Sequence, residues 1–343
     1  MGLKVRLSQG INNNKYFQNP RQVAQDSEND QIVRRGQFAY NKATTRNGEK
    51  ISIAYREGED CTVSSAYQIF YIKDEEQLNP HYLMMWFKRP EFDRYARFKS
   101  HGSAHEFFTF EDMCNVMLPV PAIEEQLRIV AEYQTVERRI KNNEALIQKL
   151  EETAQAIYHH TFVEGIDENN LPEGWRMGCL GEIVTFKVGG DKPRVFSYLQ
   201  NDVCKFPIYS NGEDDKGLYG YTNKAAVEEP SVTISARGNV GTCFLRRSPY
   251  SGIVRLVSVI PNSPQMLYYL FYVLALRKMQ GDGSAQAQIT VPQLQNETII
   301  IPSDDLLNKY YKEADTIYNN IDCIERELTH LRKLQSLLTS KLA

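Results

Sequence analysis

The sequence predicts a mixed α/β (α+β) fold in which two similar strand-rich modules are each followed by a long coiled-coil helix. One observation is a repeat: residues 102–126 and 283–307 align without a gap at an offset of 181 positions. Another is that each copy leads into a helical segment with heptad spacing of its apolar residues. The identical pairs in the repeat are Gly102/Gly283, Ser103/Ser284, Ala104/Ala285, Thr109/Thr290, Asn115/Asn296 and Pro121/Pro302.

The first module, residues 1–121, is predicted to hold short strands and one apolar helix. "KISIAYREG" and "AYQIFYI" are rich in β-branched and aromatic residues, and Asn47-Gly48 is a turn signal before them. In "NPHYLMMWF" at 79–87, a capping Asn precedes Pro at the first position of a predicted helix.

The first long helix is predicted over residues 122–163, with a linker at 164–170. Pro121 ends the preceding strand, and Glu124 and Glu125 place negative charge on the first turn, where the helix dipole favours it. The part from 122 to 160 is roughly 58 Å long at about 1.5 Å per residue. Its seam, with one polar member, includes Val136, Ile140, Asn143, Ile147 and Leu150.

The second module, residues 171–302, repeats this plan. "SVTISARG", "GTCFLRR" and "RLVSVIP" are predicted strands, and "SPQMLYYLF" at 263–271 corresponds to the helix of the first module. The second long helix, 303–343, follows Pro302. Its seam keeps the register of the first helix and includes Ile317, Ile321, Ile324, Leu328 and Leu331.

Charge separates the modules from the helices. Lys and Arg exceed Asp and Glu by 3 over the two modules, whereas acidic residues exceed basic ones by 6 over residues 122–170 and 303–343, which are the two helices with the linker. Loops of Arg, Lys, Asn and Gln suit phosphate and base-edge contacts, although an ordinary solvated surface would also explain the charge alone. The candidate DNA-binding residues are Arg34, Arg35, Lys42, Arg46, Lys50, Lys187, Lys192, Arg194, Arg237, Asn239, Arg246, Arg247, Gln286 and Gln288.

Catalytic and targeting signals are absent from the sequence. It has no GxxxxGK[ST], strand-linked GxGxxG, HExxH or GxSxG motif, and its six cysteines lack metal-ligand spacing. No apolar run is long enough for a membrane helix, and the start lacks the apolar core of a signal peptide, so a cytoplasmic location is expected. These absences favour a recognition protein over an enzyme.

Three stretches carry a resemblance to a known family over nearly the whole chain. They are "LPEGWRMGCLGEIVTFKVGG" at 171–190, "GSAQAQITVPQLQNETIIIP" at 283–302 with its echo at 102–126, and "PAIEEQLRIV" at 121–130. In this order they resemble the domain opening, domain closing and conserved helix of specificity (S) subunits of type I restriction-modification systems.

The resemblance implies a non-catalytic subunit in which two target-recognition domains each read one half of a split double-stranded DNA target. Two antiparallel helices would separate the domains and dock methyltransferase (M) subunits. These partners would carry S-adenosylmethionine, and restriction (R) subunits would join through the complex. No cofactor, metal or membrane is expected for this chain itself.

One departure and several alternatives accompany this interpretation. The first module is expected to be shortened at its N-terminus, because the counterpart of "LPEGWRMGCLGEI" would fall before Met1; at best, residues 3–10 match 183–190. A coiled-coil adaptor without a nucleic-acid role and a stand-alone nuclease remain alternatives. A relative whose partner chain fuses methyltransferase and nuclease is another.

Overall fold

The chain folds into two compact units, one formed by residues 1–145 with 325–343 and the other by 146–324. A computed structural model describes residues 30–43, 50–100, 106–277 and 288–342, and the backbone alone of 3–6 and 11–14. The Gly-Ser-Ala echoes and the candidates Arg46 and Gln286 lie outside the described residues.

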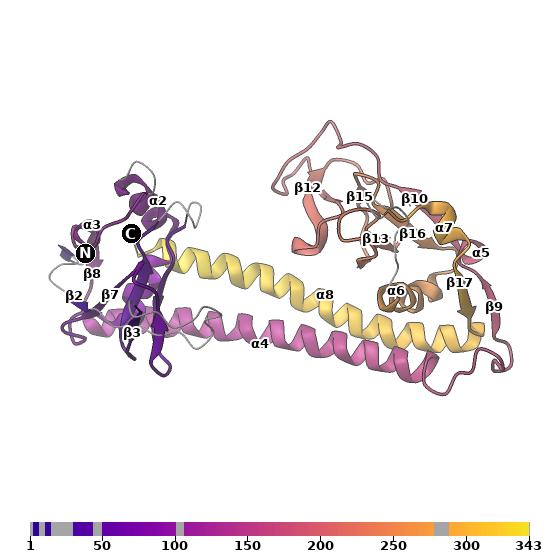
Figure 1. Ribbon diagram of the computed structural model, residues 1–343, viewed down its shortest axis with the longest axis horizontal. Coiled ribbons are helices and arrows are strands. Elements are labelled where there is room, and N and C mark those ends of the chain that lie inside the picture. The colour runs from indigo at the N-terminus through magenta and orange to yellow at the C-terminus, as the bar shows by residue number, and fades with distance from the viewer. Residues whose placement is uncertain are drawn as a thin grey trace. The chain divides into compact units, whose positions relative to one another are not determined.

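The first unit is built on a four-stranded antiparallel sheet, in which the hydrogen-bonded strands lie in the order β2-β7-β4-β5 (Figure 1). Two strand pairs, β3-β6 and β1-β8, and three helices complete the module. The strands are β1 (Leu3–Arg6), β2 (Ile11–Asn14), β3 (Gln31–Val33), β4 (Phe38–Asn41), β5 (Ile53–Tyr55), β6 (Cys61–Val63), β7 (Tyr67–Ile72) and β8 (Met117–Val120), and the helices are α1 (Pro80–Phe87), α2 (Pro90–Lys99) and α3 (Phe110–Cys114).

The second unit repeats the sheet, with strands in the order β10-β16-β13-β14. A three-stranded sheet, β12-β11-β15, and the pair β17-β9 lie beside it in the same unit. The strands are β9 (Arg176–Cys179), β10 (Val184–Val188), β11 (Phe206–Tyr209), β12 (Leu218–Thr222), β13 (Ser231–Ile234), β14 (Cys243–Arg246), β15 (Ser251–Gly252), β16 (Val257–Pro261) and β17 (Thr298–Ile301). The helices are α5 (Leu180–Ile183), α6 (Leu267–Leu276) and α7 (Val291–Gln295), with 3-10 turns η3 (Asp214–Gly217) and η4 (Pro264–Met266).

The two four-stranded sheets correspond strand by strand, because β2, β7, β4 and β5 occupy the places of β10, β16, β13 and β14. The repeat also fixes local detail. Thr109 caps α3 by accepting from the Asp112 amide, and Thr290, 181 positions later, caps α7 by accepting from the Gln293 amide. The predicted mixed α/β fold with two similar modules is therefore confirmed.

The opening strand of the second unit has a counterpart in the first, which differs from the expected alignment. β1 pairs antiparallel with β8, just as β9 pairs antiparallel with β17. Leu3–Arg6 thus corresponds to Arg176–Cys179, and the next strand, β2, corresponds to β10. This strand pairing is offset from the predicted match of residues 3–10 with 183–190. A four-residue strand carries too little pattern to fix such an alignment from sequence.

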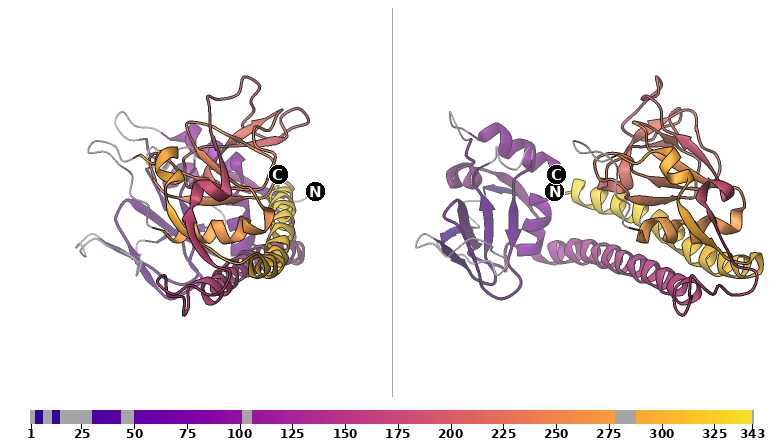
Figure 2. Two further views of the ribbon diagram at one scale, coloured as in Figure 1. Left: turned by 90° about the vertical axis from the view of Figure 1, so that its right-hand side faces the viewer. Right: turned by 45° about the vertical axis from the view of Figure 1, so that its right-hand side comes forward.

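The predicted antiparallel pairing of the long helices α4 (Ile123–Phe162) and α8 (Asp304–Ser340) is also confirmed (Figures 1 and 2). In the first unit, Tyr133 of α4 shares a core with Leu338 of α8. In the second, the rings of Tyr158 and Tyr310 lie 6.4 Å apart between centroids. Of the predicted seam residues, Val136, Ile140, Asn143, Ile321 and Leu328 are buried, and Ile147, Leu150, Ile317, Ile324 and Leu331 are partly buried.

Each module packs on its stretch of helix through aromatic side chains. In the first unit, Phe38 of β4 stacks on Phe70 of β7 at 5.0 Å, in the core that also holds Tyr133. In the second, α6 lies beside α8 (Figure 2), and Tyr268 stacks on Tyr318 with centroids 4.9 Å apart. Such rings bury large apolar areas, so module and helix form one hydrophobic core within each unit.

Candidate nucleic-acid interface

Arg34 and Arg35 lie on a tight turn between β3 and β4 of the first unit, with both residues exposed. The Gln37 amide donates to the Arg34 carbonyl at 3.1 Å, and Gly36 takes φ +85° within the turn. This left-handed conformation favours glycine, so the local sequence "RRG" fixes a turn that presents two cations to solvent.

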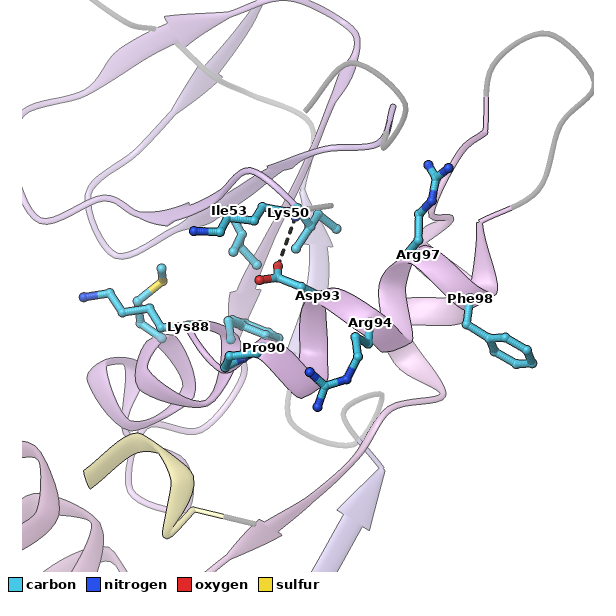
Figure 3. Close-up of a pocket in the computed structure, with 11 residues that line it drawn as sticks. Lys50, Ile53, Lys88, Pro90, Asp93, Arg94, Arg97 and Phe98 are labelled. Carbon is cyan, nitrogen blue, oxygen red and sulfur yellow. Dashed lines mark hydrogen bonds between the residues drawn. The ribbon is translucent and has the colours of Figure 1, made fainter. Parts of the chain in front are cut away.

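The other described cations predicted in this unit differ in setting. Lys42 is partly buried after β4, and its amide and carbonyl are hydrogen-bonded to Ala66 and Phe108. Lys50 is exposed and lines a basic pocket of about 990 Å³ beside α2 (Figure 3). Asp93 accepts from the Ile51 amide in this pocket at 3.1 Å, and burial raises the pKa of its carboxyl.

In the second unit, Lys192 lies among aromatic rings. Its Nζ lies 3.5 Å from the ring centroid of Phe196, and 5.7 and 5.5 Å from those of Tyr198 and Tyr219. Arg194 is exposed in the same loop, and Lys187 on β10 is exposed but donates to the Ala226 carbonyl. Cations interleaved with exposed rings are typical of nucleic-acid contact surfaces.

Arg237 and Asn239 lie on the connection between β13 and β14, and both are exposed. Arg237 donates to the side-chain oxygen of Gln288 at 3.2 Å. The Ile289 amide, next along the chain, donates to the Ala236 carbonyl at 3.2 Å. The structure therefore brings together the predicted candidates Arg237 and Gln288. A guanidinium and a side-chain amide are both suited to hydrogen-bond base edges.

Arg246 is held inside the second unit and does not present its charge to solvent. Its side chain stacks on Tyr209 at 3.5 Å, and its Nε donates to Thr233 at 3.0 Å. A further nitrogen donates to the Lys216 carbonyl at 2.6 Å. Burial lowers the pKa of this guanidinium, against the effect of the neighbouring tyrosines. We therefore place Arg246 in the packing of the module.

Arg247 clamps the second module to α8. Its guanidinium donates to Asp322, to Asp315 at 3.2 Å and to the side-chain oxygen of Asn319 at 2.6 Å. Tyr268 of α6 donates to the same Asp315 at 2.6 Å. Because its donors already meet acceptors of the chain, Arg247 is placed to orient the module on its helix.

Sequence reasoning missed the exposed apolar side chains around Lys192. Tyr198 is 72% exposed and Leu199 78% exposed, far above what a core residue shows. The signal was present in "DKPRVFSYL" at 191–199, where the cations Lys192 and Arg194 are followed by the rings Phe196 and Tyr198. It also missed Arg94 and Arg97, which line the basic pocket three residues apart on α2 (Figure 3).

Metal binding and membrane insertion also bear on function. Among the described residues, no three His, Cys, Asp or Glu side chains gather as a metal site would require. Over the same part of the chain, no helix combines the length and apolarity needed to cross a bilayer.

Comparison with known proteins adds sequence and fold relationships. The family described as type I restriction modification DNA specificity domain matches residues 9–152 and 172–332. The Mycoplasma pneumoniae protein S.MpnORF89P, which carries the name of a type I specificity subunit, is 39% identical over 125 residues, 36% of this chain and 37% of that protein. The MjaIX specificity subunit of Methanocaldococcus jannaschii is 20% identical over 76% of this chain and 67% of its own length.

A solved structure shows the same fold. The type I restriction-modification S subunit from M. genitalium superposes with a TM-score of 0.63 at 15% identity, covering 100% of this chain and 96% of that one. The matches to three Mycoplasma pneumoniae relatives span only 35% to 57% of those proteins' lengths.

Proposed function

The chain belongs to the type I restriction modification DNA specificity family, and on that premise we propose that it is the DNA-recognition subunit of a type I restriction-modification complex. Each module would read one half of a split double-stranded DNA target. The chain itself would be non-catalytic. Methylation and cleavage would belong to partner subunits.

The observation that carries this proposal is the duplication of the module. Two modules whose four-stranded sheets have the same strand order, each followed by one long helix, supply two similar readers. A target with two half-sites at a fixed separation calls for such a pair. Exposed cations lie on both units, at Arg34 and Arg35 in one and at Lys192, Arg194 and Arg237 in the other. Lys and Arg on loops supply the phosphate contacts that position a reader on DNA.

The long helices would act as the spacer and as the docking surface for methyltransferase subunits. Their segments are net acidic, which suits protein contact better than phosphate contact. S-adenosylmethionine would be bound by those partners, and restriction subunits would join through the same complex in the cytoplasm. The recognition domains would then comprise residues 1–121 and 171–302, with spacer helices at 122–163 and 303–343.

The test is co-expression of the chain with a type I methyltransferase subunit, followed by sequencing of methylated adenines. The expected result is a two-part motif with a fixed gap. A matched control replaces both Lys192 and Arg194 with Ala, which should weaken binding without changing the motif. Methylation of a continuous motif, or of the same motif without the chain, would contradict the proposal.

A further inference from the structure

A groove runs between the first module and α4. Its cavity of about 550 Å³ is lined by β5 and α1 on one side and by residues 130–141 of α4 on the other. It shares Ile53, Met84 and Lys88 with the pocket of Figure 3, so the two form one continuous depression. Ile53, Met84, Met85 and Val130 make its surface partly apolar.

The equivalent junction in the second unit is filled by the chain itself. At the 181-position offset, Gln134, Arg138 and Lys141 of α4 correspond to Asp315, Asn319 and Asp322 of α8. These three α8 residues are the acceptors of Arg247. At equivalent positions, the surface of α4 is therefore positively charged and the surface of α8 is negatively charged.

The module residues that face the long helix also differ between the two units. Aligning "NPHYLMMWF" with "SPQMLYYLF" places Met84 at the position of Tyr268 and Lys88 at that of Tyr272. Tyr268 donates to Asp315, and the Tyr272 and Tyr318 hydroxyls lie 2.9 Å apart. The residue after β5, Arg56, instead donates to the Glu59 carbonyl in its own turn. At these described positions, the first unit therefore has neither the arginine clamp nor the rings that close the second junction.

Charge in this depression is predominantly positive. Lys88 pairs with Glu137 at 3.2 Å; burial alone would lower its pKa, but Tyr133 and Glu137 raise it overall. Within the described parts of the chain, Lys50, Arg138 and Lys141 form no ion pair. Arg94 and Arg97, which also line the depression, pair with Glu91 at 3.0 Å and with Glu106 at 2.7 Å. The lining cations are Lys50, Lys88, Arg94, Arg97, Arg138 and Lys141, and the lining carboxylates are Glu57, Asp93 and Glu137.

We propose that this groove is the docking site for an acidic segment of a protein partner, one that carries carboxylates together with at least one apolar side chain. The carboxylates would meet Arg138 and Lys141, in place of the contacts that Arg247 makes in the second unit. The apolar side chain would cover Ile53 and Met84. The inference rests on the proposed function in taking the methyltransferase subunit as that partner.

An acidic peptide fits the groove better than duplex DNA does. Phosphate contacts need cations on an open surface that follows a wide duplex, whereas these cations flank a partly apolar recess between a helix and a sheet edge. Burying the recess under phosphates would leave its apolar atoms against a charged backbone. A peptide side chain removes the same atoms from water and stabilises the contact.

The decisive variant carries the residues that α8 uses itself: Gln134→Asp, Arg138→Asn and Lys141→Asp. These types are already compatible with a long helix at the equivalent positions of α8. The control, Lys73→Asp with Lys224→Asp, changes the net charge equally at exposed module positions. Circular dichroism melting checks folding. Calorimetry of full chain against methyltransferase subunit should give binding at least about tenfold weaker for the triple variant, with the control within about threefold of wild type.

A second measurement uses the otherwise unchanged chain with a photo-crosslinking amino acid at Ala131, an exposed lining residue. In the assembled complex it should attach to an acidic segment of the methyltransferase, and the triple variant should lose that product. A crosslink to DNA, a crosslink within this chain, or no crosslink would overturn the inference. Equal binding of the triple variant and the control to the methyltransferase subunit would also overturn the inference. In that case, methylation of a split motif would still support the proposed function. If the wild-type chain formed no complex with the methyltransferase subunit, the inference and the proposed function would both be contradicted.

Discussion

Replacing Arg247 with alanine separates a structural role from a DNA-binding one. The guanidinium is 17% exposed at the side chain and meets Asp315, Asn319 and Asp322 of α8. Its removal would leave Asp315 with the Tyr268 hydroxyl at 2.6 Å and the Asn319 amide at 2.8 Å. The variant therefore loses the hydrogen bonds of a partly buried charged cluster, but it does not leave the Asp315 carboxylate without a hydrogen-bond donor.

The expected cost depends on the exposure of the partners. A charge-assisted hydrogen bond is worth about 1.5–3 kcal/mol, whereas an exposed ion pair is worth about 0–1 kcal/mol. Asp315 is 32% exposed and Asp322 44% exposed, so both contacts are discounted for solvent screening. We expect Arg247→Ala to lower the free energy of unfolding by about 2 kcal/mol. For a unit of this size that lowers the melting temperature by about 4–8 °C.

The assay combines differential scanning calorimetry with DNA binding at several salt concentrations. Arg247→Ala should lower the melting transition of the second unit while leaving the slope of log affinity against log salt unchanged. Arg237→Ala is the matched control, because this exposed arginine donates to Gln288 and, among the residues that the structure describes, to no carboxylate. It should change stability by less than about 0.5 kcal/mol and lower the slope by up to about one.

The opposite pattern would refute the structural role of Arg247. If Arg247→Ala melted like the wild type and lowered the salt slope by about one, its guanidinium would contact phosphate in the complex. The clamp on α8 would then be a resting arrangement that DNA displaces.

Three further results are expected. Asn143→Leu, which replaces a buried polar seam residue, should raise the melting temperature and loosen the choice of oligomeric arrangement seen by light scattering; a lower melting temperature with intact helicity would show that the amide is needed there. Replacing Lys192 and Arg194 together with Ala should weaken DNA binding similarly for all sequences and lower the salt slope by up to about two, whereas an unchanged slope would make them bystanders. Inserting four residues after Ala145 should lengthen α4 by about 6 Å and rotate the C-terminal part of the helix by about 40°. The preferred gap between methylated half-sites should then grow by one or two base pairs; methylation at the original gap alone would argue against a spacer role.

The repeat was readable from sequence because it recurs at one offset in elements with strong local signals. Thr109 and Thr290 cap equivalent short helices, and the long helices carry seams over many turns. Such signals are local, so they survive without knowledge of tertiary packing. The short strands are different, since Leu3–Arg6 is identified as an opening strand only by its pairing with β8.

The candidate site was less predictable because a cation near a turn has the same local sequence whether it faces solvent or protein. Arg246 and Arg237 both flank loops of the second module, yet one is 4% exposed and stacked on Tyr209 while the other is exposed. Their partners lie far away in sequence. For Arg247, the spacing of Asp315, Asn319 and Asp322 on one face of α8 was a usable signal. Nothing in the local sequence, however, connected that face with the arginine.

The division of the chain into units has a consequence for its synthesis. The second unit is one uninterrupted stretch, 146–324, whereas the first needs residues 1–145 and also 325–343. Leu342 is buried in the same core as Phe38. A ribosome therefore delivers everything the second unit requires before it delivers the last piece of the first. We expect chains truncated after residue 324 and released from the ribosome to contain a protease-resistant second unit and a protease-sensitive first module. The module encoded first would thus be the last to be completed, and a late premature stop codon would disable the opening half of the protein.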